Sequence, residues 1–255
     1  KAYVICVDFE DCVGAERVEY GDLQNVFWTE GMEYDYSKPE TYYKTIFMGS
    51  DSFGEDFTGE QEYVGMVEYF NQVSYGMMDM EVEFINAMVP NEDGSWPWFR
   101  LPGEQRDWAI QYASEVEDYR IFGRLYEGAL EVAYEQVPDL NIDDISFLYV
   151  VTPVNTFGFR SGLQGGAGID TAFSYQDQAI ILRDTELRHE PLLTTENGVV
   201  IGSGTTITKG ARGYDGADRS YFRVMAHETG HGLGLIDDYT YSGTDHLSAN
   251  SRSWS

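Results

Sequence analysis

Cysteine is scarce in this chain, with 2 cysteines among 255 residues. Cys6 and Cys12 both lie in the segment VICVDFEDCV, and an unbroken strand would separate them by roughly 20 Å. A disulfide between them needs a sharp turn at residues 8–11, because bridged Cα atoms lie within about 7 Å of each other. We therefore expect two small buried or half-buried thiols, and cysteine usage does not indicate the redox compartment.

Long hydrophobic runs are also lacking. No stretch approaches the roughly 20 consecutive apolar residues that a transmembrane helix requires. The sequence opens on the strand-like segment AYVICVDF rather than on a signal-peptide pattern. We expect no insertion into a membrane.

Positive charge is the third scarce feature. The chain has 16 Lys and Arg against 44 Asp and Glu, for a net charge of −28, and its only lysines are Lys1, Lys38, Lys44 and Lys209. This negative field repels nucleic acid and anionic membranes, so we expect neither as a partner, and it attracts cations such as calcium. An acid-rich, lysine-poor surface suits a protein that works in salty water, where screening removes much of the repulsion.

The hydrophobic pattern indicates one domain that mixes helices and strands. A chain of this length buries roughly 70–75% of the surface that its unfolded form exposes, and no repeat or clear linker divides it. The segment 145–154 is apolar on both faces, as in the centre of a sheet. The fold class we expect is α+β, with a mixed twisted sheet packed on helices. Further strands are predicted at 3–9 and within 77–89, and helices within 60–76, within 104–137 and from about 217.

Two of the four histidines lie in HETGHGLGLIDDY, residues 227–239. Residues four apart share one face of a helix, so His227 and His231 can both approach a zinc ion at about 2.0–2.1 Å. Glu228 lies one residue round from His227, beside the metal, where its carboxylate can take a proton from a metal-bound water. A chance H-E-x-x-H arises in roughly one such chain in a hundred or fewer, so the pattern favours zinc binding over an ordinary amphipathic helix.

Catalytic zinc needs a third protein ligand if its fourth position is to stay open for water. Gly234 ends the helix three residues after His231, since glycine adopts a left-handed turn cheaply. The turn brings Asp237 back toward the ion, so we expect His227, His231 and Asp237 as the ligands. The adjacent Asp238 leaves an alternative open, because either carboxylate can instead cap the turn or bind calcium.

With these residues the chain resembles the immune inhibitor A family of secreted bacterial zinc metallopeptidases. The family signature H-E-x-G-H-x-L-G-L-x-D-x-Y is matched at every fixed position by residues 227–239. VICVDFEDC resembles the family's opening strand. YVGMVEYFNQVSYGMMDMEVEF (63–84) resembles its helix, serine-tyrosine-glycine turn and following strand. The three blocks span nearly the whole chain in the same order.

The resemblance implies a secreted, extracellular or cell-surface endopeptidase with a metzincin-like catalytic domain and a zinc-binding helix near the C-terminus. It implies that His227, His231 and Asp237 bind zinc, that Glu228 is the general base and acid, and that calcium stabilises the domain. In the family, a methionine beyond the zinc helix forms a floor under the metal, whereas this sequence stops at RSWS (252–255). We therefore expect residues 1–255 to be a single catalytic domain without its C-terminal part and without any signal peptide or propeptide.

The expected reaction is hydrolysis of a peptide bond in a protein or peptide substrate. Zinc lowers the pKa of its bound water toward about 7, and Glu228 takes the proton and passes it to the leaving amine. Tyr239, Tyr241 and His246 are candidates, by nearness alone, for the donor that stabilises the oxyanion. A second function stays open, a surface or assembly protein that keeps the fold for binding or architecture with little turnover.

Two further features accompany the enzyme hypothesis. Substrates of such enzymes add as a strand to a sheet edge, and QAIIL (178–182) and GVVIGSGTTIT (198–208) are the candidate edges. Carboxylates at 8–11, at 214–218 and at Asp238 are dense enough for structural calcium. None forms a full calcium-binding loop, so we expect most of them to be solvated.

We expect the stability of the protein to rise with ionic strength, because salt screens the repulsion among its acidic side chains. The midpoint of urea unfolding should be higher in molar salt than in dilute buffer. Equal midpoints in the two solutions would contradict the expectation.

Overall fold

The computed structural model describes residues 1–15, 37–49, 65–108, 121–153, 193–199, 201, 204–207, 226, 229, 230 and 233. The strands in this part of the chain are β1 (Ala2–Asp8), β2 (Val82–Phe84), β3 (Phe99–Arg100), β4 (Phe147–Val151) and β5 (Gly204–Ile207). The helices are α1 (Tyr42–Met48), α2 (Met66–Val73), α3 (Gln105–Trp108) and α4 (Ile121–Gln136), and a short 3₁₀ helix, η3, covers Ile85–Met88.

The strands form one small sheet in the order β2-β1-β4-β5, and β3 pairs with β1 as well. β1 lies parallel to β4 over Ala2–Cys6, and it lies parallel to β2 and β3 over shorter stretches. β5 runs parallel to β4. The prediction of a sheet packed on helices is thus confirmed, but the expected mixed sheet is not what the described strands form, since all of their pairings are parallel. Parallel neighbours follow from the chain order, because helices or long connections separate the strands.

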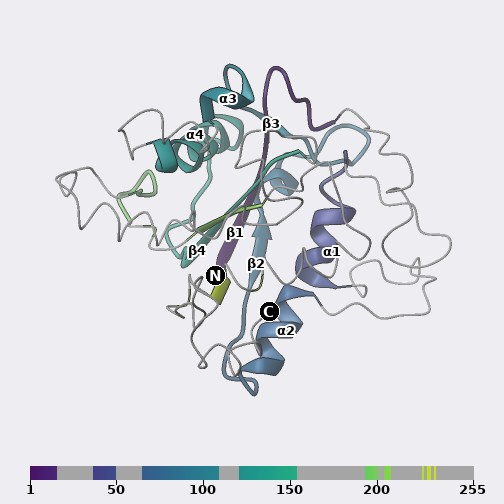
Figure 1. The fold of residues 1–255 in the computed structure, drawn as a ribbon, viewed down its shortest axis with the longest axis vertical. Coiled ribbons are helices and arrows are strands. Elements are labelled where there is room, and N and C mark those ends of the chain that lie inside the picture. The colour runs from purple at the N-terminus through teal and green to yellow at the C-terminus, as the bar shows by residue number, and fades with distance from the viewer. Residues whose placement is uncertain are drawn as a thin grey trace, which may run out of the picture.

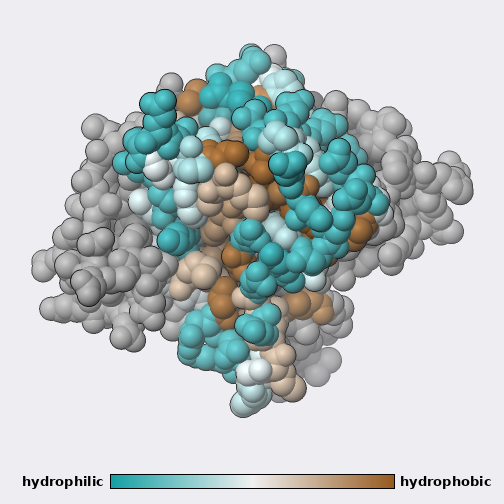
Figure 2. All heavy atoms as spheres, turned by 180° about the vertical axis from the view of Figure 1, so that it is seen from behind, coloured by the Kyte–Doolittle hydropathy of each residue, from teal (hydrophilic) through white to brown (hydrophobic). Residues whose placement is uncertain are grey.

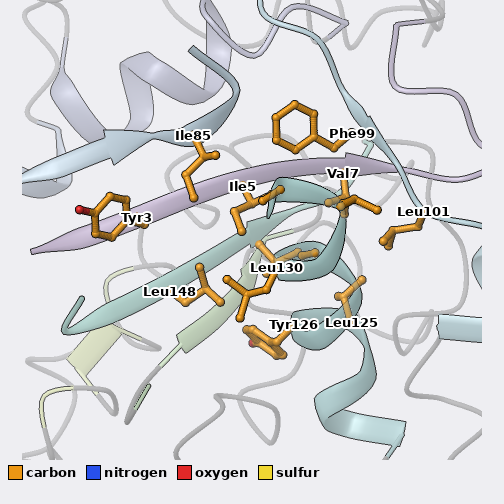
Figure 3. Close-up of a cluster of buried hydrophobic side chains, with 14 of the residues drawn as sticks. Tyr3, Ile5, Val7, Ile85, Phe99, Leu101, Leu125, Tyr126, Leu130 and Leu148 are labelled. Atoms are coloured by element: carbon orange, nitrogen blue, oxygen red, sulfur yellow. The ribbon is translucent and has the colours of Figure 1, made fainter. Parts of the chain in front are cut away.

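Helices cover both faces of this sheet (Figure 1). All seven residues of β1 and all five of β4 are buried, as expected for strands between two helical layers. Successive residues of a strand point to opposite faces, so alternate residues of β1 enter different hydrophobic cores. On one face Tyr3, Ile5 and Val7 pack against α4 (Figure 3). On the other face Ala2, Val4 and Cys6 pack with α1 and α2.

The face of the sheet that helices α1 and α2 cover is rich in aromatic rings. Phe47 of α1 contacts Phe84 and Tyr149 edge-on, with ring centroids 5.5 and 4.8 Å apart. Such edge-to-face pairs contribute about 0.5–1.5 kcal/mol each beyond the area that they bury. At Gly65, which caps α2, a Cβ would lie 2.3 Å from the backbone nitrogen of Gly49. The absence of a side chain there lets the two helices meet.

The side chain of Asn86 fills a gap along one edge of β1. β2 pairs with Ala2–Val4 and β3 pairs with Val7 and Asp8, which leaves the backbone of Cys6 between them. Asn86 Oδ1 accepts a hydrogen bond from Cys6 N at 2.8 Å, and Asn86 Nδ2 donates to Cys6 O at 2.9 Å and to Pro97 O at 2.8 Å. Asn86 is fully buried, so its amide satisfies backbone groups that water cannot reach.

An ion pair between a buried carboxylate and a half-exposed arginine lies where β1 and β3 end. Asp8 is 2% exposed, and its carboxylate accepts hydrogen bonds from Arg100 Nε at 2.6 Å, Arg100 Nη2 at 3.0 Å and Gly14 N at 2.9 Å. We expected most of the acids at the candidate calcium segments to be solvated, and Asp8 is an exception. The carboxylate is buried because a bidentate arginine, the strongest partner for a carboxylate, compensates its desolvation.

The predicted elements compare closely with the described ones in the centre of the fold. The strands expected at 3–9 and 145–154 are β1 and β4, and Cys6 and Cys12 are both buried thiols. Burial raises the pKa of the Cys6 thiol well above its usual range, so this thiol is unreactive at neutral pH. The strand expected within 77–89 covers only Val82–Phe84, because Asn86 turns inward and the chain continues as η3.

We predict that Asn86→Ala lowers the free energy of unfolding by about 3 kcal/mol, because buried backbone groups of Cys6 and Pro97 lose their partners. Denaturant unfolding monitored by circular dichroism measures the change. Asn91→Ala is the matched control, since Asn91 Nδ2 bonds only the exposed Ser95 Oγ, and we expect it to cost less than about 0.5 kcal/mol. Equal losses for both variants would show that Asn86 does not support the edge of β1.

Candidate functional site

We call the stretch from Ala226 to Leu233, which contains HETGH, the HETGH segment. The structure describes four of its residues, Ala226, Thr229, Gly230 and Leu233. The predicted ligands His227, His231 and Asp237 and the predicted base Glu228 lie outside the described residues. So do Asp238, the oxyanion candidates Tyr239, Tyr241 and His246, and the segments 178–182 and 214–218. The described residues therefore report on how the segment is anchored.

The described backbone has the hydrogen bonding of a helical turn. Leu233 N donates to Thr229 O and to Gly230 O, both at 3.0 Å. One N–H shared between the carbonyls three and four residues earlier is common near the ends of helices. The side chain of Leu233 is 46% exposed. The turn thus begins at the buried Thr229 and ends at the half-exposed Leu233.

Thr229 anchors the segment to the centre of the sheet. Its side chain is fully buried, and its Oγ1 shares a 2.7 Å hydrogen bond with the hydroxyl of Tyr149, 80 residues earlier on β4. Ala226 packs against the hydrophobic core that α1 and α2 form on this face. Ala226 and Thr229 therefore lie on the face of the sheet that α1 and α2 cover, opposite the face that α4 covers.

Tyr149 is held rigidly around this hydrogen bond. Its ring contacts Phe47 of α1 and Phe147 of β4, with centroids 4.8 and 4.5 Å away. Burial raises the pKa of Tyr149 above its ordinary value, and the hydrogen bond with Thr229 opposes part of that rise. The hydroxyl is therefore protonated at all physiological pH values and serves as a neutral hydrogen-bonding group.

The sequence analysis did not predict that Tyr149 is the hydrogen-bond partner of Thr229, although one feature of the sequence pointed to a buried hydroxyl. The segment ISFLYVVTPV (145–154) is apolar on both faces except for a few hydroxyl groups. A tyrosine that is buried in such a strand needs a partner for its hydroxyl. The sequence alone does not say which of the distant polar side chains supplies it.

Within the described residues, no group of three or more His, Cys, Asp and Glu side chains is placed to hold a metal ion. At the first candidate calcium segment, 8–11, Arg100 and Gly14 bond the carboxylate of Asp8, and Asp11 accepts hydrogen bonds from the backbone and side chain of Gln105. These partners occupy oxygens that a calcium ion would need.

The candidate edge strand 198–208 includes β5, which stands at the end of the described strand order. β5 pairs with β4 through Leu148–Val151. Among the described residues no strand lies on its other side. Its use by a substrate stays a prediction.

Comparison with known proteins adds no assignment: no protein-family model matches the chain, and no curated protein matches it either. None of the described helices is both long enough and apolar enough to cross a membrane.

We predict that Tyr149→Phe lowers the free energy of unfolding by about 1–2 kcal/mol, because the buried hydroxyl of Thr229 loses its partner. Combined with Thr229→Val, a double-mutant cycle should give a coupling energy of about 1 kcal/mol. Tyr134→Phe is a matched control whose hydroxyl accepts from Glu196 N in an exposed setting, and we expect it to be nearly neutral. Additive effects of the two core substitutions would contradict a direct tether.

Proposed function

We propose that this protein is a zinc-dependent endopeptidase that hydrolyses peptide bonds in protein or peptide substrates. The proposal rests first on the sequence HETGHGLGLIDDY, in which His227, His231 and Asp237 are the zinc ligands and Glu228 is the general base. Their donor set, two imidazoles and one carboxylate, is one that catalytic zinc uses while keeping a position for water.

The anchoring of Thr229 is the structural observation that supports this proposal. Two residues of an α-helix correspond to a rotation of about 200°, so positions 227 and 231 are expected on the side opposite Thr229. Thr229 is turned into the sheet, where it meets Tyr149. In this proposal both histidines lie on the side of the helix that faces away from Thr229, and zinc and the substrate bind on that side.

Each proposed residue has one task. Bound zinc supplies a Lewis acid that activates water and polarises the scissile carbonyl. Glu228 accepts the proton of the attacking water and donates it to the leaving amine. The tether between Thr229 and Tyr149 keeps the helix from rotating about its axis, and a rotation would move both imidazoles together.

The setting of such an enzyme follows from the charge of the chain. A net charge of −28 with few lysines suits a secreted enzyme in salty surroundings, where screening limits self-repulsion. We propose an extracellular or cell-surface location and a metzincin-like fold on these grounds and on the family resemblance. Calcium as a structural ion belongs to the same proposal.

The first test is metal content together with activity. We expect about one zinc ion per chain by elemental analysis, and hydrolysis of casein that is lost with a chelator and returns with added zinc. Bound zinc without hydrolysis of casein would favour the alternative function, a surface or assembly protein. Absence of zinc even after reconstitution would refute the proposal.

The second test separates catalysis from metal binding. Glu228→Gln should reduce the kcat for casein peptides by at least about 10²-fold while zinc stays bound, because the general base is lost and the ligands are kept. His231→Ala should instead lose zinc and activity together. Glu131→Gln, on the exposed side of α4, is the matched control and should change neither. Unchanged kcat in Glu228→Gln would exclude this residue as the base.

A further inference from the structure

Exposed hydrophobic side chains gather at the turn between α2 and β2. The described part of the chain exposes six large hydrophobic side chains, and three of them lie within residues 73–77. Val73 is 45% exposed, Tyr75 93% and Met77 85%. Exposed hydrophobic residues are ordinary when they are scattered, whereas a group of them marks a contact site. We name Val73, Tyr75 and Met77 the apolar tip.

The apolar tip stands at one end of the molecule. The turn that carries it lies at the lower end in Figure 1, beyond the amino ends of β1 and β2. Figure 2 shows pale and light-brown atoms at that lower end, with teal, hydrophilic atoms above them. The side chains of the tip are accessible to a partner.

The backbone of this turn is fixed by its own hydrogen bonds. Gly76 N donates to Asn71 O at 2.8 Å, Met77 N to Ser74 O at 3.2 Å and Met78 N to Ser74 Oγ at 2.8 Å. Asn71 Nδ2 donates to Met78 O across the turn at 3.3 Å. The bonds close the end of α2 in the manner of a Schellman motif. The tip is thus ordered before any partner arrives, which lowers the entropy lost on binding.

Tyr75 occupies a backbone conformation that disfavours its side chain. Its φ angle is +57°, and the next residue, Gly76, has φ +76°. A left-handed conformation is strained for a bulky residue but not for glycine. The hydrogen bonds that close α2 hold the backbone of Tyr75 in this conformation, whereas its almost fully exposed side chain adds little support. A bulky side chain kept at a strained, exposed position favours a role in a contact outside the chain.

The charge around the tip selects the partner. Residues 66–83 contain four acidic residues, Glu68, Asp79, Glu81 and Glu83, and no Lys or Arg. Lys1 pairs with Glu81 and Glu83, whereas Glu68 and Asp79 are exposed beside the tip. The whole chain is also strongly negative. This field repels anionic membranes and acidic proteins and attracts cationic ones.

We propose that the apolar tip is a docking site for a cationic polypeptide, with Tyr75 and Met77 packed against an apolar face of the partner and Glu68 and Asp79 beside its basic side chains. Exposed tyrosines are frequent anchors in such interfaces, because they bring a large contact area at a low cost in conformational entropy. This inference is independent of the peptidase proposal.

The test uses an amphipathic helical peptide of lysine and leucine as the probe, with a peptide of glutamate and leucine for comparison. Fluorescence anisotropy at physiological salt should show binding of the cationic peptide alone. The double variant Tyr75→Ser/Met77→Ser keeps every charge, and we expect it to weaken this binding by about tenfold or more. Met88→Ser, an exposed methionine elsewhere, is the matched control and should bind as the natural chain does.

Each contrary result overturns the inference. Equal binding by the double variant would show that the charge of the chain, and not the tip, attracts the peptide. Failure of the natural chain to bind the cationic peptide would refute the proposed docking site. Binding of the natural chain to neutral phosphatidylcholine vesicles, lost in the double variant, would assign the tip to a membrane surface.

A stability measurement on Tyr75→Gly tests the strain separately. Glycine adopts the left-handed conformation without strain, so the thermal midpoint of unfolding should rise. Binding of the cationic peptide should weaken, because a residue that is kept for function often costs stability. A lower midpoint would mean that Tyr75 stabilises the turn itself, which would overturn the inference.

Discussion

The complete burial of β1 is the constraint on which the rest of this structure depends. Each of its backbone groups must find a partner inside the protein, since water does not reach it. β4 pairs with one edge over five residues, and β2, Asn86 and β3 share the other edge. The buried amide of Asn86 thus lets two short strands, separated by a turn, act as one neighbour of β1.

The same burial divides the molecule into two cores with different tasks. Alternate residues of β1 and β4 meet α4 on one face, where the contacts are aliphatic and aromatic and serve stability. On the other face they meet α1 and α2 and the segment that contains Ala226 and Thr229. Tyr149 is a core residue of β4 and also the hydrogen-bond partner of Thr229. The central sheet therefore sets the position of the segment on which the proposed function rests.

The local hydrophobic pattern was sufficient to predict a strand where the environment of the segment is the same along its whole length. β1 and β4 are apolar on both faces, which only a central strand between two layers satisfies, and both were predicted within two or three residues. β2 was predicted too long, because the inward turn of Asn86 depends on Cys6, 80 residues earlier. The burial of Asp8 was not predicted either. Its partner Arg100 lies 92 residues away, and the residues next to Asp8 contain no pattern that predicts this ion pair.

Residue types at short, fixed distances were enough to predict the two buried strands, the negative charge and the spacing of His227, Glu228 and His231. The contact of Thr229 with Tyr149, the ion pair of Asp8 with Arg100 and the exposure of Tyr75 in a left-handed turn could be found only in the folded chain. These facts join residues far apart in the chain or depend on what the fold leaves uncovered. A linear pattern records periodicity, whereas a hydrogen bond or an ion pair forms where the packing of the whole chain brings two groups together.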